Sequence, residues 1–182
     1  NNGIGPLRVF NDDRLVPGAV WPMHPHQDVE GLTYVVEGLF GHEDNVGGDF
    51  GPLPAGSVQR MPLGRGALHS EQNASATEAM RFIQIWILPF RAGLAPHVEQ
   101  EILTTADRTN RLLRAFSGSG GGVVKVYGDV EGYVSRLEAG RRVAHQFDPG
   151  RAGYLYVIGG ALTINAEQVT TGDAVKIHDE TD

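Results

Sequence analysis

The chain contains an internal repeat, which restricts its fold more than any other feature. YVVEG at 34–38 reappears as YVIGG at 156–160, and LVPG at 15–18 reappears as LEAG at 137–140, both 122 residues later. LPAGSVQRM at 53–61 resembles VTTGDAVKI at 169–177, here 116 residues later. Self-similarity at this spacing indicates two copies of one supersecondary unit. Because short β-branched runs alternate with glycine turns, we expect an all-β chain in which each copy forms a small antiparallel barrel or double-sheet roll.

The division between the two copies is expected near the run SGSGGG at 117–122, whose composition is typical of a flexible linker. Helical periodicity is confined to residues 101–114, a short helix or a loop. We therefore predict a barrel over 1–100, a connecting segment over 101–122 and a second barrel over 123–182. The second copy ends where the first has reached Gly66, so we expect the second barrel to be incomplete, with open strand edges that a homodimer would cover.

The composition excludes several classes of protein. A formal charge of −7 argues against direct binding to nucleic acid. The absence of cysteine excludes disulfides and thiolate metal sites and suits a reducing compartment, and we expect the cytoplasm. No apolar stretch is long enough to predict a membrane span. The sequence motifs of phosphate-binding loops, dinucleotide-binding folds and serine hydrolases are absent.

Two pairs of side chains share the spacing that places neighbours on one face of a strand. His24 and His26 precede an expected strand, and His69 and Glu71 follow in GRGALHSEQN. If both pairs face one barrel interior, three imidazoles and one carboxylate could bind Fe(II), Ni(II), Cu(II), Mn(II) or Zn(II). A single H-x-H is a weak signal, because most histidines in β proteins are ordinary polar residues. The second pair favours a metal site.

The repeat serves as an internal control for this interpretation. At the spacing of 122, His24 corresponds to Gln146 and His26 to Asp148, so the scaffold residues recur and the histidine pair does not. This difference favours a specific role for the first copy. Glu30 is a fifth ligand candidate, and its spacing could equally place it at the pocket wall. The other histidines receive no ligand role: His42, in an expected turn where a surface or second-layer position is predicted, and His97, His145 and His178.

The motifs also resemble a known family. Gly18-x5-His24-x-His26-x3-Glu30 resembles the first cupin motif, and His69-x3-Asn73 resembles part of the second. More specifically, HPHxxxExxTYVxEG and GxGxxHSE are similar to the pirin family over about residues 3–100, with a weaker, scaffold-like resemblance from about 123. The resemblance implies two tandem cupin barrels, each a double-stranded β-helix or jelly roll. It also implies that the second barrel is degenerate and metal-free.

The resemblance further implies a function. The ligands of the family map onto His24, His26, His69 and Glu71 around one divalent metal, often iron. Several bacterial pirins are similar to quercetin 2,3-dioxygenase, so we expect a small phenolic substrate and dioxygen, with Glu71 as catalytic general base. The eukaryotic pirin is a transcription co-regulator. A non-catalytic, redox-responsive module acting through a protein partner is therefore the alternative, and a structural cupin with an incidental metal is the third reading.

Overall fold

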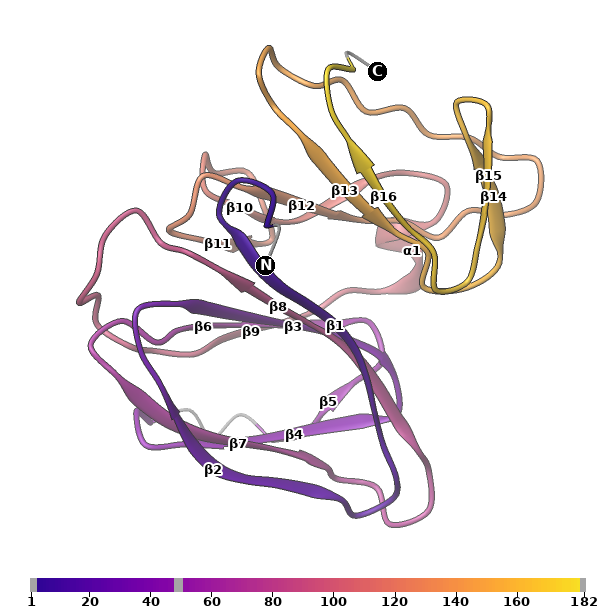
Figure 1. Ribbon diagram of the computed structural model, residues 1–182. Coiled ribbons are helices and arrows are strands. Elements are labelled where there is room, and N and C mark those ends of the chain that lie inside the picture. Colours follow the sequence, from indigo (N-terminus) through magenta and orange to yellow (C-terminus); the bar gives the residue numbers. More distant parts are fainter. Residues whose placement is uncertain (1–2, 48–50, 181–182) are drawn as a thin grey trace. The chain divides into compact units, whose positions relative to one another are not determined.

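The computed structural model describes residues 3–47 and 51–180, and it confirms the expected all-β fold (Figure 1). The chain divides into two compact units, Asn1–Arg142 and Val143–Asp182. In the described part of the chain the only helix is α1, Thr105–Arg108, which is the short-helix alternative for 101–114. Among these residues no helix is both long enough and apolar enough to cross a membrane.

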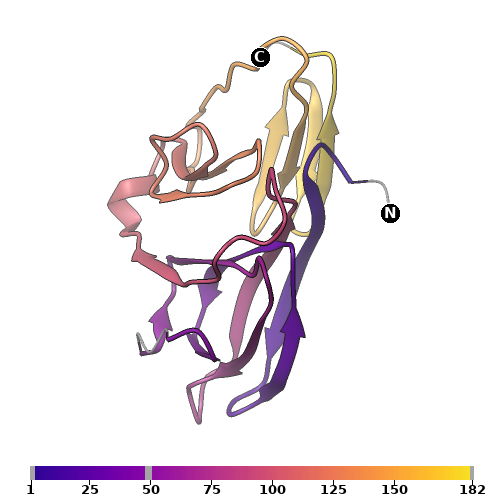
Figure 2. The ribbon, with the colours of Figure 1, turned by 90° about the vertical axis from the view of Figure 1, so that its left-hand side faces the viewer.

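Two sheets face each other in the first unit (Figure 1). One sheet has the strand order β1-β8-β3-β6-β9 and the other β2-β7-β4-β5, and all neighbours within them are antiparallel. Figure 2 shows β1 and β8 running side by side along the unit. The strands are β1 Leu7–Leu15, β2 Val20–His26, β3 Glu30–Glu37, β4 Leu39–Asp44, β5 Leu53–Pro54, β6 Ser57–Pro62, β7 Ala67–Asn73, β8 Met80–Ile87 and β9 Glu99–Ile102.

The five-stranded sheet buries both of its faces. Toward the second sheet, Phe82 of β8 packs edge-on against Trp21 and Phe40, at ring-centroid distances of 5.7 and 5.3 Å. The opposite face belongs to a core cluster that also includes Phe116 of a small third sheet. That sheet consists of β10 Leu113–Ser117, β11 Val124–Lys125 and β12 Glu131–Val134. The run FIQIWIL at 82–88 is apolar at every position except Gln84, which suits such a strand, because a strand covered on both sides is apolar on both faces.

The glycine-rich run has a local role in this third sheet. It connects β10 to the parallel strand β11, and the amide of Val126 donates to the carbonyl of Ser117 at 3.0 Å. The domain boundaries inferred from the sequence stay a prediction.

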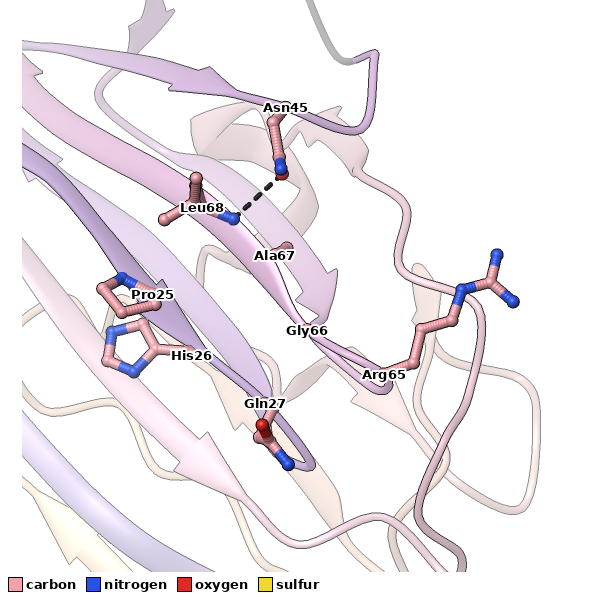
Figure 3. A pocket seen from close by; sticks show the side chains of 8 residues that line it. All are labelled: Pro25, His26, Gln27, Asn45, Arg65, Gly66, Ala67 and Leu68. Atoms are coloured by element: carbon pink, nitrogen blue, oxygen red, sulfur yellow. Dashed lines mark hydrogen bonds between the residues drawn. The ribbon is translucent and has the colours of Figure 1, made fainter.

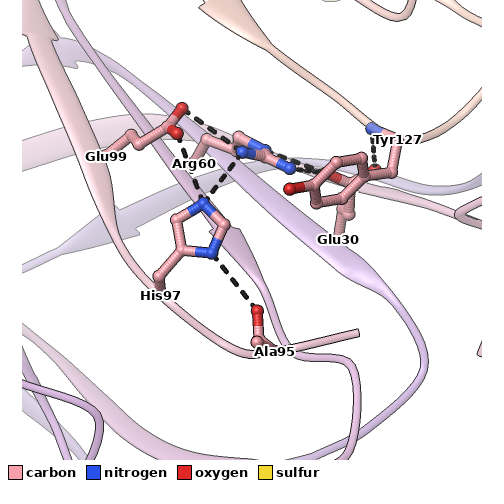
Figure 4. A network of polar contacts seen from close by, with 6 residues as sticks. All are labelled: Glu30, Arg60, Ala95, His97, Glu99 and Tyr127. Carbon is pink, nitrogen blue, oxygen red and sulfur yellow. Dashed lines mark hydrogen bonds and ion pairs between the residues drawn. The ribbon is translucent and has the colours of Figure 1, made fainter. Parts of the chain in front are cut away.

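A buried ion pair ties β3 and β6 to the segment that follows β11 (Figure 4). Arg60 donates to Glu30 Oε1 from Nε at 2.9 Å and from Nη2 at 2.7 Å, and the amide of Tyr127 donates to Oε2 at 2.6 Å. The guanidinium also lies 4.4 Å from the centre of the Tyr127 ring. Glu30 and Arg60 are 0% and 1% exposed. Glu30 is thus part of an internal ion pair, whereas the sequence suggested a fifth ligand or a pocket-wall position.

The second unit repeats two of the strand pairings of the first. β13 Gly153–Tyr156 pairs with β16 Ala174–Ile177 as β3 pairs with β6, and β14 Ala161–Ile164 pairs with β15 Glu167–Thr170 as β4 pairs with β5. The register is the same: Tyr34 lies opposite Val58, and Tyr156 lies opposite Ala174. These pairs are related by the two spacings found in the sequence. The inferred duplication is therefore visible in the backbone.

A glycine turn is reproduced along with the strands. Gly56 has φ of 93° and its counterpart Gly172 has φ of 89°, in the left-handed region that favours glycine. The amide of each donates at 2.8 Å to an equivalent carbonyl, of Val35 and of Val157 respectively. The recurring glycines of the sequence therefore mark backbone turns that only residues tolerant of positive φ can form.

Candidate metal centre

Neighbouring strands β2 and β7 present the two side-chain pairs found in the sequence. His24 lies opposite His69 across the ladder, and the register shifts between Trp21 and His24. Pro22 lies within this shift, on a strand at the edge of its sheet, where a residue without an amide hydrogen is tolerated. The bulge re-aims the following residues, which brings His24 and His26 onto the face that carries His69.

The four predicted side chains lie together in the structure. The rings of His24, His26 and His69 have centroids 4.5–5.2 Å apart, and one nitrogen from each lies within 4.8 Å of the others. Glu71 joins this cluster, with Oε2 at 3.8 Å from His24 Nε2 and Oε1 at 3.5 Å from His69 Nδ1. The sequence therefore predicts the proximity of these residues correctly, and their role as ligands stays a proposal.

Hydrogen bonding leaves specific atoms of the cluster available. His24 Nδ1 lies 2.8 Å from the carbonyl oxygen of Pro22, and because a carbonyl only accepts, Nδ1 carries the proton. The lone pair of His24 is therefore on Nε2, the atom that faces Glu71. Glu71 Oε2 and His69 Nε2 are buried and have no hydrogen-bond partner. Such atoms are costly to bury unless something binds them.

Burial favours the neutral form of two of these imidazoles, those of His69 and His26. It lowers the pKa of His69 to about 3, with further lowering from the neighbouring charges of His24, His42 and His26. The pKa of His26 is lowered by burial and by His24. Burial raises the pKa of Glu71, against the opposing effects of His24 and of the hydrogen bond from Gln84. Since only a neutral imidazole can bind a metal, these two histidines are ready to act as ligands at neutral pH.

Strand β8 supports the cluster from the opposite sheet through residues for which we predicted no role in the site. Gln84 Nε2 donates to Glu71 Oε1 at 3.0 Å, and Trp86 packs edge-on against His26 with ring centroids 4.5 Å apart. A signal for Gln84 was present, because it is the single polar residue in FIQIWIL. Its partner could not be read from the sequence, since contacts across facing sheets follow no fixed spacing.

His42 and Asp44 of β4 form a further pair on the other side of β7. His42 Nδ1 lies 3.5 Å from Asp44 Oδ2, and the His42 and His69 rings are 5.5 Å apart. The His42 side chain is only 2% exposed, so the surface position suggested by the sequence is wrong, and the second-layer position stays a prediction. The sequence signal for the His42–Asp44 pair was its i, i+2 spacing, which the other two pairs share.

A cavity of about 460 Å³ opens beside His26 (Figure 3). This volume falls within the range of about 300–1,000 Å³ typical of small-molecule sites. Arg65 extends outward at its rim, and Asn45 Oδ1 accepts the amide of Leu68 at 2.9 Å across its wall (Figure 3). The lining consists of Pro25, His26, Gln27, Asn45, Arg65, Gly66, Ala67 and Leu68.

Comparison with known proteins agrees with the motifs. Residues 3–87 match the family model described as Pirin, and residues 115–182 match the one described as Quercetinase C-terminal cupin domain. Quercetin 2,3-dioxygenase of Escherichia coli K12 is 37% identical over 178 residues, which cover 98% of this chain and 76% of that protein. The chain belongs to the pirin family. A pirin-like protein of Caulobacter vibrioides is 34% identical over 182 residues, 99% of this chain and 78% of that protein.

Solved pirin structures share the fold. The crystal structure of YhhW from Escherichia coli superimposes with a TM-score of 0.91 at 37% identity, covering 98% of this chain and 75% of that chain. A complex of the same bacterial pirin with nickel(II) superimposes with a TM-score of 0.88, covering 98% and 76%. The sheets seen here are thus those of a pirin-type cupin.

Proposed function

We propose that this pirin is a mononuclear metal-dependent dioxygenase that cleaves quercetin-like flavonols or related phenolics with dioxygen. The ligands of the metal would be His24, His26, His69 and Glu71. The observation that carries the proposal is the pair of buried atoms without hydrogen-bond partners, Glu71 Oε2 and His69 Nε2, within a cluster of imidazoles whose nitrogens lie within 4.8 Å. Related proteins named quercetin 2,3-dioxygenase support the reaction class.

The donor set fits one divalent ion. Three imidazole nitrogens and a carboxylate oxygen suit Fe(II), Ni(II), Cu(II), Mn(II) and Zn(II), and we propose Fe(II). The nickel(II) complex of the related Escherichia coli pirin supports a single transition-metal site without deciding the ion. When bound, such an ion would act as a Lewis acid that lowers the pKa of a phenol and favours its anion.

Protein residues would supply binding and proton transfer. The cavity beside His26 would hold the phenolic ring system next to the cluster. Glu71 Oε2, which has no hydrogen-bond partner from the protein, would accept the proton of the phenol hydroxyl on loosening from the metal. Trp86 covers one side of His26, which limits the access of water to this ligand.

The metal site is tested first. Wild-type protein, His69→Ala and His178→Ala are loaded with Fe(II) under anaerobic conditions, desalted, and analysed for metal content. We expect about one ion per chain in the wild type and in His178→Ala, which removes an exposed histidine outside the cluster, and close to none in His69→Ala. A metal content in His69→Ala equal to that of wild type would refute the proposed ligand set.

Turnover is tested with the loaded protein. Incubation with quercetin in air should bleach the flavonol absorbance and consume dioxygen, and His69→Ala should not do so. If stoichiometrically loaded protein turns over none of several flavonols and catechols, the dioxygenase proposal fails. A metal-dependent binding module, the alternative suggested by the family, would then be the better description.

A further inference from the structure

Gln84 separates the two oxygens of Glu71 into different roles. Its Nε2 donates to Oε1 at 3.0 Å, whereas Oε2 is buried, has no hydrogen-bond partner and lies 3.8 Å from His24 Nε2. The orientation of the amide follows from chemistry, because an ionised carboxylate only accepts hydrogen bonds. The buried amide group therefore engages Oε1, which also lies 3.5 Å from His69 Nδ1, and leaves Oε2 beside His24 without a hydrogen-bond partner.

The strand that carries Gln84 is suited to hold this arrangement. β8 is hydrogen-bonded on both sides, to β1 and to β3, whereas β2, which carries two of the histidines, lies at the edge of its sheet. Phe82 and Trp86, two residues before and after Gln84, pack against Trp21 and His26. Gln84 is 8% exposed. Its amide is thus fixed by a central strand and by packed neighbours on both sides.

We infer that Gln84 is a positioning residue that makes Glu71 present a single oxygen to the metal. The inference rests on the proposed function, since it presumes that Glu71 is a ligand. A carboxylate free to bind through both oxygens would fill a position that a substrate needs. By engaging Oε1, Gln84 keeps that position open. Groups that orient a ligand in this way affect metal affinity by about 10–100-fold.

The chain offers a matched control in Gln59. Gln59 lies in the same sheet, in register with Gln84 on either side of Thr33. It is 4% exposed and accepts a hydrogen bond from Gln100 at 2.7 Å. Gln59→Met therefore removes a buried, hydrogen-bonded amide from the same sheet without touching Glu71. A loss of stability common to both variants can be separated from an effect on the metal.

The test uses Co(II), whose visible d–d bands report its coordination. Wild type, Gln84→Met and Gln59→Met are titrated with Co(II), and the spectrum and the dissociation constant are recorded. We expect Gln84→Met to show shifted d–d bands and a dissociation constant raised about tenfold or more, with Gln59→Met matching wild type. A folded Gln84→Met whose spectrum overlays that of wild type would overturn the inference.

Two further outcomes are also decisive. If the wild type itself binds no Co(II), the proposed metal site fails, which is a different result from an unaltered Gln84 variant. If Gln84→Met does not fold, the comparison is made with Gln84→Asn and Gln59→Asn, which keep an amide but shorten its reach by one methylene. Shifted bands in Gln84→Asn alone support the inference, and overlaid spectra overturn it.

Discussion

Two glutamates in the first unit are equally buried and differ in how their oxygens are used. Glu30 is 0% exposed, and both of its oxygens accept hydrogen bonds, from Arg60 and from the amide of Tyr127. Glu71 is 1% exposed, and one of its oxygens has no hydrogen-bond partner. Burial alone therefore does not distinguish a structural carboxylate from a functional one. The use of each oxygen does, because a buried oxygen without a hydrogen-bond partner still has all of its lone pairs available for a ligand.

We expect the largest effect on the free energy of unfolding, when Glu30 and Glu71 are each replaced by glutamine in metal-free protein. Glu30→Gln leaves Arg60 buried without its main partner, so we expect the free energy of unfolding to fall by about 3 kcal/mol. Glu71→Gln removes a buried charge but keeps an oxygen that can accept from Gln84, so in metal-free protein we expect a change within about 1 kcal/mol. Urea denaturation of the metal-free variants measures both. Equal losses would contradict the distinction.

Stabilisation by a bound metal should depend on Glu71 and not on Glu30, the reverse of the order expected for metal-free protein. A ligand that binds only the folded state at 100 times its dissociation constant stabilises that state by about 2.7 kcal/mol. We expect this increment from Ni(II) or Fe(II) in wild type and in Glu30→Gln, because the ion pair lies outside the histidine cluster. Glu71→Gln should lose most of it. Thermal denaturation with and without the metal, with a chelator as the reference, provides the measurement.

The histidine cluster should make the stability of the protein depend on pH. The pKa of His69 is about 3 in the folded protein, against an ordinary value of 6.5. Between these values the unfolded chain binds a proton that the folded chain does not, so stability falls as the pH falls. Glu71 acts in the opposite sense, because its raised pKa makes proton uptake below neutral pH favour the folded state.

The two contributions can be separated in a Glu71→Gln background. There, adding His69→Gln should flatten the decline in metal-free stability between pH 6 and pH 4 by about 1 kcal/mol per pH unit. Urea denaturation at several pH values gives the slope. An unchanged slope would show that His69 is not buried in its neutral form.

The sequence predicts the residues of the site better than it predicts their partners. His24 and His26 share a face because strand geometry alternates, and the scaffold of the second unit follows from the recurring glycines. No such rule predicts the contact from Gln84 to Glu71 or the pairing of Glu30 with Arg60. Both depend on which sheet or segment lies against a strand, and packing of that kind is set by the whole fold.

We expect the smallest loss of stability from replacing Glu99, the exposed carboxylate partner of Arg60. Glu99 Oε2 lies 3.3 Å from Arg60 Nη1, but its side chain is 42% exposed, whereas that of Glu30 is 0% exposed. Water screens such a pair and hydrates the charge that remains when the partner is removed. We therefore expect Glu99→Gln to lower the free energy of unfolding by less than about 1 kcal/mol, well below the loss in Glu30→Gln. Urea denaturation of both variants, at low and at high salt, measures the two losses. Salt should reduce the loss in Glu99→Gln more than the loss in Glu30→Gln. A larger loss in Glu99→Gln would mean that Arg60 depends on its exposed partner, and that Glu30 is not the residue that compensates the buried guanidinium.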